Sequence, residues 1–548
     1  MLAIVTMLAF GAPPAFSDVS ATCGIDAVHR TPEDLEFDRM LGGGAVIDVN
    51  QDGRPDLFML GGGAAPDRLY VNQGDGTFVE ESGAWGLDRT HRGSGIAVGD
   101  VDRDGRPDLF VTSRGSGATP SVGPNLLYLH RGDHFDEVAS AWGIATTTDL
   151  PDGMGAAFGD VDLDGDLDLF TTSWFPGGGG NRLALNMGDH FIDATHLLPD
   201  LTGTRGFTPR LVDLDGDAYP EVLLVGDFGT TTILANDAGR AFRDRRDQAG
   251  VVHDRNGMGS TVGDFDLDGR LDWFVSSIFI HLPPMAPSGN CLYMGRGDLT
   301  FEDQARVRGV QDTAWAWGCV AFDADLDADL DLAVTNGWPD WFYHDTALYL
   351  NDGAAKFTDV GREAGLDDWF QGRTVVDLDL EGDGDRDLVF FVHGGTPRVY
   401  RNDTLAGHWL ALDLDTSDTP CLAPDGFGAR VTITTDRVQT RVVDGNPTFL
   451  GAGDRTIHVG LGDATSADLD IAWPDGTTTT LMGVEANRRL VVRAPHGADF
   501  DGDGVVGPAD LDAFLVAFHA LDPRTDQNRD GAFDIFDIIR FVRRFDGC

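Results

Sequence analysis

The stretch Asp100-Val-Asp-Arg-Asp-Gly-Arg-Pro-Asp108 decides the fold, because it is one of seven copies of a nine-residue pattern. Every copy carries Asp, Asn or Glu at positions 1, 3, 5 and 9. Calcium takes six to eight oxygen ligands, and a tight loop can direct alternate side chains toward one point. The pattern therefore predicts one calcium site per copy, with Ca2+ as the cofactor.

The seven copies, called loops 1 to 7 in chain order, together supply the predicted metal ligands. These are Asp48, Asn50, Asp52 and Asp56; Asp100, Asp102, Asp104 and Asp108; Asp160, Asp162, Asp164 and Asp168; Asp213, Asp215, Asp217 and Glu221; Asp264, Asp266, Asp268 and Asp272; Asp323, Asp325, Asp327 and Asp331; and Asp379, Glu381, Asp383 and Asp387. An alternative interpretation of one such loop is a solvated acidic turn. Seven copies in one register argue against that alternative.

Position 6 of the loops predicts which sites are weak. Five loops have glycine there, which allows the sharp turn without a clash of the Cβ atom: Gly53, Gly105, Gly165, Gly269 and Gly384. Loops 4 and 6 have Ala218 and Ala328 instead. An L-residue at positive φ costs about 1 kcal/mol. We therefore expect loops 4 and 6 to bind calcium most weakly.

The loops lie between short runs that are typical of β-strands. Residues 95–99 precede loop 2 and residues 109–112 follow it, and both runs are rich in β-branched and apolar residues. A third run such as 68–72 and a fourth that ends near Phe78 complete the unit. Four strands in a unit of about fifty residues are typical of a propeller blade. The sequence predicts a mainly β fold with a seven-bladed β-propeller over residues 25–402.

These repeats resemble FG-GAP/VCBS repeats, the type also found in integrin α-subunit propellers. The resemblance rests on the seven loops and their flanking strands. It implies one calcium ion per blade, held by the four side chains named above and a main-chain carbonyl. Two RGD tripeptides, at Arg131–Asp133 and Arg296–Asp298, fall in the turn between the third and fourth strands. We interpret them as turns rather than as integrin-binding motifs.

Composition and charge exclude some classes of protein. The 548 residues include 90 Asp and Glu against 40 Lys and Arg, a formal net charge of −50. Nucleic acid is an unfavourable partner for such a polyanion, since phosphate contacts need Lys and Arg. The hydrophobic content of 42% argues against disorder. Residues 1–17 are predicted to be a signal peptide, and no later run is apolar for long enough to be a transmembrane segment. We expect a secreted, extracellular or cell-surface protein. For Cys291 and Cys319, a disulfide and two buried thiols remain open alternatives.

Residues 408–495 lack the nine-residue pattern and predict a small all-β domain. The residues resemble an ASPIC/UnbV domain at four points: Gly426–Val431, Gly460–Gly462, Trp473–Gly476 and Asn487-Arg488. A propeller followed by this domain resembles the cartilage acidic protein-like bacterial family. That resemblance implies extracellular binding.

Residues 497–548 predict a small α-helical module with two calcium loops of the EF-hand type. The expected ligands are Asp499, Asp501, Asp503 and Asp510, then Asp526, Asn528, Asp530 and Asp537. A helix is expected after each loop. The module resembles a dockerin type I module, which implies a cohesin-like partner. Pro508-Ala509 and Ile535-Phe536 replace the small hydroxyl residues that often read a cohesin, so anchoring or self-association is the open alternative.

Aromatic residues in loops on the face opposite the calcium loops predict a ligand-binding surface. The candidates are Trp174, Phe175, Trp338, Trp341 and Tyr343. Packing of these rings over the propeller core is the alternative. Three functions remain open: a non-enzymatic binding or adhesion module for an extracellular protein or polysaccharide, a polysaccharide lyase or hydrolase, and a purely structural module. No catalytic residues can be assigned, because 90 carboxylates would obscure any catalytic pair.

Overall fold

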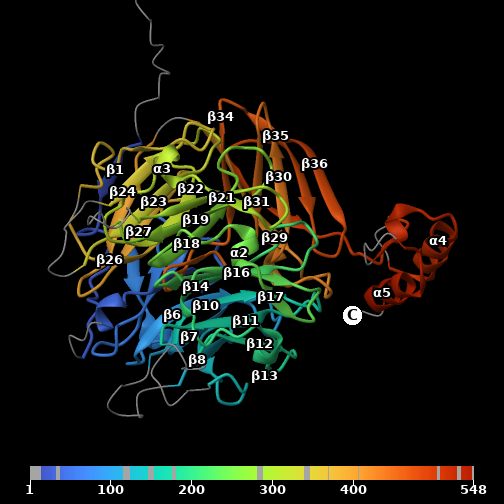
Figure 1. The fold of residues 1–548 in the computed structure, drawn as a ribbon, viewed down its shortest axis with the longest axis horizontal. Helices are drawn as coiled ribbons and strands as arrows, with labels where there is room; N and C mark the ends of the chain where they lie inside the picture. Colours follow the sequence, from blue (N-terminus) through green and yellow to red (C-terminus); the bar gives the residue numbers. More distant parts are fainter. Residues whose placement is uncertain are drawn as a thin grey trace, which may run out of the picture.

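The computed structural model describes residues 14–32, 37–114, 124–145, 153–175, 180–279, 288–338, 346–367, 369–404, 407–502, 506–527 and 532–545. The fold is mainly β, with four-stranded antiparallel sheets repeated along the chain and few helices (Figure 1). This arrangement is a β-propeller-like repeat fold, as the sequence predicts.

Seven sheets share one topology, in which neighbouring strands pair antiparallel in chain order. The first four sheets contain β2 (Gly44–Ile47), β3 (Asp56–Met59), β4 (Arg68–Asn72) and β5 (Phe78–Glu80); β6 (Gly93–Gly99), β7 (Asp108–Ser113), β8 (Leu126–His130) and β9 (Phe135–Glu137); β10 (Gly153–Gly159), β11 (Asp168–Ser173), β12 (Arg182–Asn186) and β13 (Phe191–Asp193); and β14 (Arg205–Val212), β15 (Glu221–Asp227), β16 (Thr232–Asn236) and β17 (Phe242–Asp244).

The next three sheets continue the pattern. They contain β18 (Gly257–Gly263), β19 (Asp272–Ser277), β20 (Cys291–Gly295) and β21 (Phe301–Asp303); β22 (Ala316–Phe322), β23 (Asp331–Asn336), β24 (Ala347–Leu350) and β25 (Thr358–Asp359); and β26 (Gly372–Leu378), β27 (Asp387–Val392), β28 (Arg398–Asn402) and β1 (Phe16–Asp18).

The first strand of each sheet contacts the first strand of the next sheet. Contacts run from β2 through β6, β10, β14, β18 and β22 to β26, and β26 contacts β2 again. Hydroxyl groups support this packing: the Thr172 hydroxyl donates to the Phe207 carbonyl at 2.7 Å, and the Thr208 hydroxyl donates to the Met258 carbonyl at 2.7 Å. The first strands are almost fully buried, which explains why these runs are apolar on both faces.

Residues 16–18 supply the fourth strand of the seventh sheet. Phe16 pairs with Asn402, and Asp18 pairs with Tyr400, in an antiparallel ladder. The Phe16 side chain is buried in the apolar cluster between the sixth and seventh sheets. The predicted repeat boundary at residue 25 therefore omits one strand. The strand also overlaps the end of the predicted signal peptide, residues 1–17, so that a cleavage after residue 17 would remove most of it.

Short helices follow the fourth strand in three sheets. They are α1 (Ser82–Trp85), α2 (Arg246–Ala249) and α3 (Ala305–Arg308), and each ends at a glycine with φ between 75° and 93°. Turns of 3-10 helix occur at η1 (Asp38–Met40), η2 (Thr195–Leu197), η3 (Pro424–Gly426) and η4 (Pro523–Thr525). Cys291 and Cys319 are buried free thiols in the core, so the alternative of a disulfide between them is wrong.

The C-terminal β domain (residues 408–495) contains two sheets around its own core. One sheet has the order β34 (Ile457–Gly462), β29 (His408–Asp415) and β37 (Arg488–Arg493). The other has the order β31 (Val438–Val442), β30 (Arg430–Thr434), β35 (Ser466–Ala472) and β36 (Thr478–Glu485). Leucine, valine and isoleucine side chains from both sheets pack around Trp473, which is 1% exposed.

A hairpin of the C-terminal β domain enters the centre of the ring of sheets. We call residues 444–454 the plug; it contains β32 (Pro447–Thr448) and β33 (Gly451–Ala452). Ala452 pairs in parallel with Ala45, which extends the first sheet to six strands. Phe449 and Leu450 are buried against Phe207, Met258 and Trp317. The plug therefore fills the centre that the sheets alone would leave open, a feature that the sequence did not reveal.

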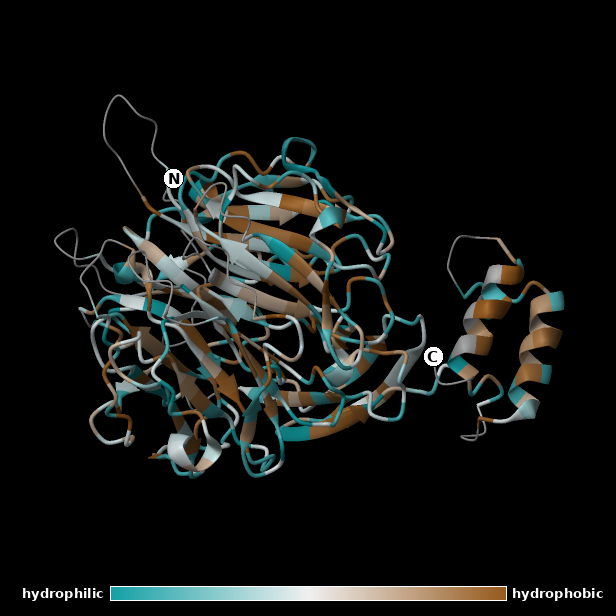
Figure 2. Ribbon diagram, turned by 90° about the horizontal axis from the view of Figure 1, so that it is seen from below, coloured by the Kyte–Doolittle hydropathy of each residue, from teal (hydrophilic) through white to brown (hydrophobic). Residues whose placement is uncertain are grey.

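The C-terminal segment contains α4 (Pro508–His519) and α5 (Ile535–Phe545), the two helices that the sequence predicts. Phe514 and Phe541 stack with ring centroids 4.0 Å apart and join the helices. The pair lies beside the body of the molecule (Figures 1 and 2). One contact to the C-terminal β domain is a hydrogen bond from the Arg544 guanidinium to the Asp475 carbonyl.

The closing strand β1 gives a stability prediction. Phe16→Ala removes a buried aromatic side chain, and such losses cost about 3–5 kcal/mol. We expect the melting temperature in calcium to fall by several degrees. The matched control is Val79→Ala on the outer strand β5, because Val79 is 46% exposed and such surface changes stay within about 0.5 kcal/mol. Equal melting temperatures for the two variants would contradict a closing role for β1.

Candidate metal centres

Each nine-residue loop joins the first and second strands of one sheet. Position 1 directly follows the first strand, and position 9 begins the second strand: Asp100 follows β6, and Asp108 begins β7. The seven loops therefore lie at the same edge of their sheets. Antiparallel order places the connections between second and third strands at the opposite edge.

The carboxylate at position 9 holds each loop to two strands. In loop 2, one Asp108 oxygen accepts from the Val101 amide at 2.8 Å, and the other accepts from the His130 amide on the third strand at 2.8 Å. The bond to the amide of position 2 occurs in all seven loops. The position-9 side chains are at most 1% exposed. Position 9 is therefore a structural carboxylate as well as a candidate ligand.

Positions 4 and 6 of every loop have left-handed backbone conformations. At position 6, φ is 81° at Gly105, and it is 77° at both Ala218 and Ala328. The expected strain at these two alanines is confirmed. Position 4 was not predicted to be strained, yet φ is also positive there; five loops have non-glycine residues at this position, namely Gln51, Arg103, Leu163, Leu267 and Leu326. Six of the seven loops therefore hold at least one non-glycine residue in this strained conformation, and loop 6 holds two.

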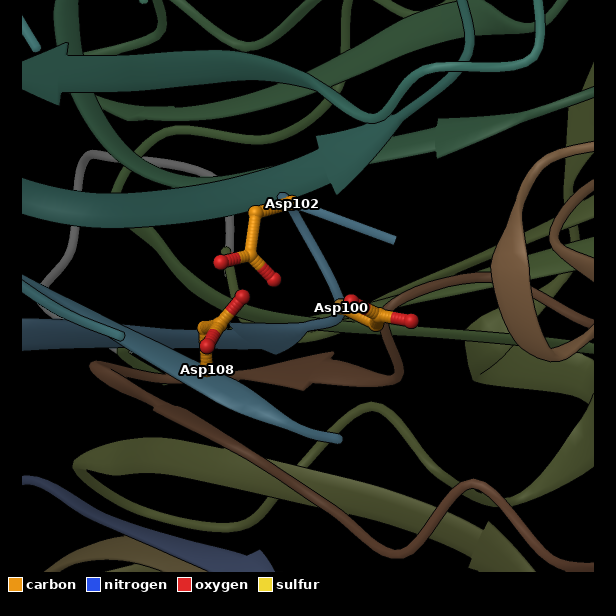
Figure 3. A group of neighbouring side chains, drawn as sticks. All are labelled: Asp100, Asp102 and Asp108. Atoms are coloured by element: carbon orange, nitrogen blue, oxygen red, sulfur yellow. The ribbon is translucent and has the colours of Figure 1, made fainter. Parts of the chain in front are cut away.

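The structure brings most of the predicted ligands together. In loops 2, 3, 4 and 6, positions 1, 3 and 9 each offer a carboxylate oxygen within 4.8 Å of the others, and in loop 5 positions 1, 3 and 5 do so. Figure 3 shows this group in loop 2, where Asp100, Asp102 and Asp108 surround one small space. Three carboxylates this close repel one another unless a cation or protons lie between them.

In loops 2, 3, 5 and 7, the carboxylate at position 3 has an oxygen that nothing in the described protein satisfies. The buried Oδ1 atoms of Asp102, Asp162 and Asp266 have no hydrogen-bond partner among the described residues, and neither does Oε2 of Glu381 in loop 7. By contrast, position 1 accepts two amides of its own loop, as Asp100 does from Asp104 and Gly105. Leaving a buried polar atom without a partner costs about 1–3 kcal/mol. The unpartnered oxygen at position 3 therefore indicates a bound cation.

Position 5 lies at the rim of the loops, and in three of them the arginine at position 7 of the same loop neutralises it. The Arg106 guanidinium lies 2.7 Å from the Asp104 carboxylate, and Arg54 and Arg270 make the same pair with Asp52 and Asp268. Arg131, the arginine of one RGD tripeptide, forms an ion pair with Asp102 at 2.7 Å. This arginine is therefore engaged with loop 2, while Gly132 makes the turn that the sequence predicts, with a φ of 95°.

Burial raises the pKa values of the clustered carboxyl groups. Desolvation, the largest cause, raises the pKa of Asp56 to about 7, that of Asp272 to about 8 and that of Glu221 to about 9. Neighbouring carboxylates raise them further. A folded pKa above the unfolded value means that metal-free stability is lost as pH rises from about 4 through these values. A bound dication would reverse this loss.

Asparagine side chains tie five of the loops to a neighbouring sheet, a feature that the sequence analysis did not predict. Asn186 at the end of β12 donates to the Val101 carbonyl, at position 2 of loop 2, at 2.8 Å. Asn236, Asn351 and Asn402 make the same bond to loops 3, 5 and 6, and Asn72 makes it to loop 7. His130 replaces asparagine for loop 1. A recurring Asn at the end of the third strand is the signal that could have identified this ladder.

Three of the predicted aromatic candidates, Trp174, Phe175 and Trp338, lie at the opposite edge of the sheets. Trp174 and Trp338 are half-buried and pack on the apolar cluster around the plug, so the alternative of a packed lid holds for part of each ring. Phe175 is half-buried, with its centroid 4.9 Å from that of Phe37. Trp341 and Tyr343 lie outside the described residues. Phe228 and Trp369, which the sequence did not single out, are 63% and 62% exposed.

The tail residues are described only in part. Asp510 accepts the amides of Asp501 and Gly507 at 3.1 and 2.8 Å, and Asp537 accepts those of Gln527 and Asp534 at 2.8 and 2.9 Å. Position 12 of each tail loop thus orders the loop before the helix. Asp503, Asn528 and Asp530 lie outside the described residues.

Position 6 gives a prediction for loop 4. Ala218→Gly relieves a residue held at a φ of 77°, and we expect calcium affinity at loop 4 to rise up to about fivefold, since the strain is about 1 kcal/mol. The matched change is Gly105→Ala in loop 2, where an added Cβ meets nothing within 4 Å, so that only the backbone is strained. Calcium titration calorimetry should show opposite shifts; shifts of the same sign would contradict the argument.

Comparisons with known proteins match two kinds of family model to parts of the chain. FG-GAP-like repeats match residues 48–111 and 213–275, and the ASPIC and UnbV domain matches residues 422–499. Cartilage acidic protein 1 of Mus musculus is 22% identical over 89% of this chain and 78% of its own length. The Homo sapiens protein of that name is 23% identical over 91% of this chain and 78% of its own length.

Two solved structures show low overall similarity. BBS1N in complex with ARL6DN has a TM-score of 0.38 and 9% identity, and the match covers 71% of this chain and 97% of that chain. The extracellular domain of a hybrid two-component system of B. thetaiotaomicron has a TM-score of 0.39 and 9% identity, over 87% of this chain and 58% of that chain. Among the described residues, no helix is both long enough and apolar enough to cross a membrane. The chain thus carries FG-GAP-like repeats followed by an ASPIC and UnbV domain, and it is distantly similar to cartilage acidic protein 1 along most of its length.

Proposed function

We propose that this protein is a secreted, calcium-loaded, seven-bladed β-propeller that acts as a non-enzymatic binding or adhesion module for an extracellular partner, with polysaccharide as the ligand class. The observation that carries the calcium assignment is the buried, unpartnered oxygen at position 3 of loops 2, 3 and 5. A solvated acidic turn would expose this oxygen to water instead of burying it among other carboxylates.

The donor set fits calcium rather than a softer metal. The grouped atoms of loops 2 to 6 are carboxylate oxygens, with no cysteine or histidine among them. Hard oxygen ligands suit calcium or magnesium, and flexible loops of seven or so oxygens favour calcium. Positions 1, 3 and 9 would hold the ion, with position 5 and a main-chain carbonyl completing the shell.

The seven-blade assignment follows from the sheets and their closure. Seven sheets of one topology pack through their first strands, and the contacts return from β26 to β2. The strand β1 (Phe16–Asp18) joins the last sheet and ties the two ends of the ring together, so in the proposed secreted protein any cleavage precedes Phe16. The distant similarity to cartilage acidic protein 1 supports the proposal that the protein is exported. A calcium-rich extracellular medium would fill sites with Kd values of about 10⁻⁴–10⁻³ M.

Half-buried and exposed aromatic rings support a binding surface opposite the loops. The Arg205 guanidinium lies 4.8 Å from the Trp174 ring centroid and 5.0 Å from that of Phe228, so it is held between two rings. Trp315 and Trp338 stack with centroids 5.0 Å apart and planes at 7°. Flat aromatic surfaces suit sugar rings, and a fixed guanidinium suits hydroxyl or acidic groups of a polysaccharide. The tail loops would bind two further calcium ions and anchor the protein to a cohesin-like or other partner.

Calcium dependence is the first test. In 10 mM calcium, sites with Kd values of about 0.1–1 mM each stabilise the fold by about 1.4–2.7 kcal/mol. We expect differential scanning calorimetry to show a melting temperature at least 10 °C lower after EGTA, restored by calcium but not by magnesium. Asp162→Asn with Asp266→Asn should remove two bound ions per chain, counted by atomic absorption, whereas Asp189→Asn, on a side chain that is 89% exposed, should remove none. An unchanged melting temperature would refute the calcium assignment.

The ligand surface has its own test. Calcium-loaded protein should be retained on one or more members of a panel of immobilised neutral and acidic polysaccharides. Phe228→Ala and Trp369→Ala should lower the affinity at least fivefold, because both rings are mostly exposed and can contact a ligand. The same exposure means that the two changes should have little effect on stability. Met187→Ala, a 50% exposed side chain in the turn between β12 and β13, is the control. Release of reducing ends or unsaturated products from any polymer would favour an enzyme; retention by no polymer would overturn the ligand class.

A further inference from the structure

The C-terminal β domain lies on the edge of the ring that carries the calcium loops. Arg430 donates to the carbonyl of Gly269 in loop 5, and Arg489 donates to the carbonyl of Gly53 in loop 1. His458 contacts the carbonyl of Gly384 in loop 7 at 2.8 Å. Arg437 contacts the Asp327 carbonyl of loop 6 at 3.3 Å and the Asp329 carboxylate at 3.4 Å. The domain therefore contacts the backbone of four loops through side-chain donors.

The acceptor in these contacts is mostly the carbonyl of position 6. The five loops with glycine at position 6 all use this carbonyl: loops 1, 5 and 7 accept from the C-terminal β domain, and loops 2 and 3 accept from Gln51 and Arg103 of the preceding loop. The direction of this carbonyl depends on the positive φ of position 6. A loop that relaxes without its ion would turn the acceptor away from the arginine.

Close packing accompanies the hydrogen bonds. A Cβ atom at Gly384 of loop 7 would overlap the Trp409 ring, and one at Gly165 of loop 3 would overlap the Pro420 carbonyl. The Asp323 side chain at position 1 of loop 6 faces Gly460, where an added Cβ would lie 2.2 Å from its carboxylate. At position 1, Asp323 of loop 6 is 1% exposed and Asp160 of loop 3 is 7% exposed, whereas Asp48 of loop 1 is half-buried. Ions in loops 3 and 6 would be covered by the domain.

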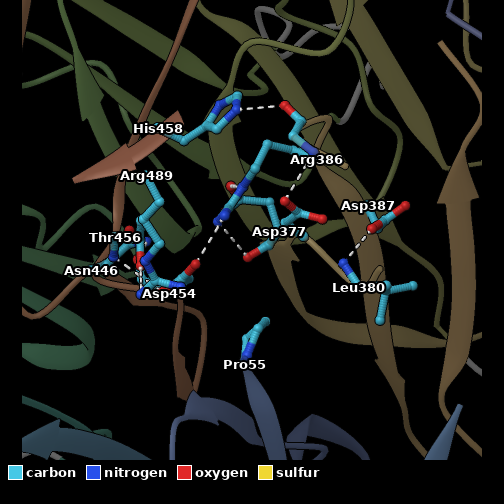
Figure 4. A network of polar contacts seen from close by, with 12 residues as sticks. Pro55, Asp377, Leu380, Arg386, Asp387, Asn446, Asp454, Thr456, His458 and Arg489 are labelled. Atoms are coloured by element: carbon cyan, nitrogen blue, oxygen red, sulfur yellow. Dashed lines mark hydrogen bonds and ion pairs between the residues drawn. The ribbon is translucent and has the colours of Figure 1, made fainter. Parts of the chain in front are cut away.

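A buried ion-pair network anchors the domain beside the plug (Figure 4). The Arg386 guanidinium, at position 8 of loop 7, lies 2.8 Å from the Asp377 carboxylate and 2.9 Å from the Asp454 carboxylate of the plug. Arg210 on β14 lies 2.5 Å from Asp444, also in the plug. These groups line a cavity of about 110 Å³ between the ring and the domain. Removing one partner of such a buried ion pair costs about 3–5 kcal/mol. These ion pairs therefore hold the plug end of the C-terminal β domain firmly on the ring.

We propose that the C-terminal β domain is a calcium-dependent cap: filled loops hold the carbonyls that the cap binds, and the docked cap slows release of the ions that it covers. This inference rests on the calcium sites proposed above. One coupling free energy links docking and ion binding, so the docked cap raises the calcium affinity of these loops by the same factor by which their ions favour docking. Slower release is the expected kinetic consequence of that tighter binding. The plug holds the cap in place, while the contacts of Arg430, Arg437, Arg489 and His458 respond to the ions.

The first experiment empties two loops while the others stay filled. Asp266→Asn with Asp325→Asn weakens loops 5 and 6 in the full chain at 1 mM calcium. Hydrogen exchange followed by mass spectrometry should show at least tenfold faster exchange in residues 430–442 of the cap. Exchange in the plug and in β8 should stay unchanged. Equal exchange in residues 430–442 with and without these ions, counted by atomic absorption, would overturn the cap but leave the calcium sites intact.

The reciprocal experiment changes the cap and measures the ions. Arg430→Ala with Arg437→Ala removes two positive charges near loops 5 and 6, and charge alone would make calcium bind more tightly there. Loss of docking predicts the opposite: release of two ions to a fluorescent chelator, followed by stopped flow, at least threefold faster than in the unmodified protein. Arg296→Ala, in an exposed pair with Glu302 on the outer turn of the fifth sheet, is the matched control. Slower or unchanged release would overturn the cap, and absence of any bound ion would overturn the calcium sites themselves.

Discussion

The carboxylate at position 9 of each loop is the interaction on which the repeat depends. It is buried, and it receives the amide of position 2 and, in six sheets, an amide at the end of the third strand. One side chain therefore fixes the loop, the start of the second strand and the third strand at once. A charge-assisted bond to a buried carboxylate contributes about 1.5–3 kcal/mol, and its loss would leave a desolvated charge. The strands and the candidate metal site thus share one residue.

This sharing explains why the loops tolerate strain. Positions 4 and 6 have positive φ in all seven loops, although most position-4 residues are not glycine. The strain persists because the flanking strands and the position-9 carboxylate fix both ends of the loop. The result is a preorganised ring of oxygens whose mutual repulsion falls when a cation enters. Asparagine side chains then bind five of the loops to the neighbouring sheet.

The two faces of the ring of sheets are used differently. The loop face is covered by the C-terminal β domain, whose plug fills the centre with Phe449 and Leu450. The opposite face carries half-buried tryptophans and exposed rings such as Phe228. A ligand surface on that face is compatible with a closed centre, because binding there requires no passage through the ring. The acidic loops, which dominate the sequence, serve structure and interdomain contact as much as surface charge.

The sequence by itself determined the repeat, the strand order within each unit, the strained position 6 and the boundary near residue 408, since these depend on local spacing and on backbone preferences. It also indicated both tail helices. It could not reveal contacts between segments far apart in the chain: the pairing of Phe16–Asp18 with β28, the entry of residues 444–454 into the centre, or the arginines that bind loop carbonyls. It left the Cys291–Cys319 question open, and the structure shows two free thiols. Tertiary structure decided these features because non-local packing, ring closure and the burial of single charges depend on which surfaces meet. The periodicity of the sequence does not specify which distant segments come into contact.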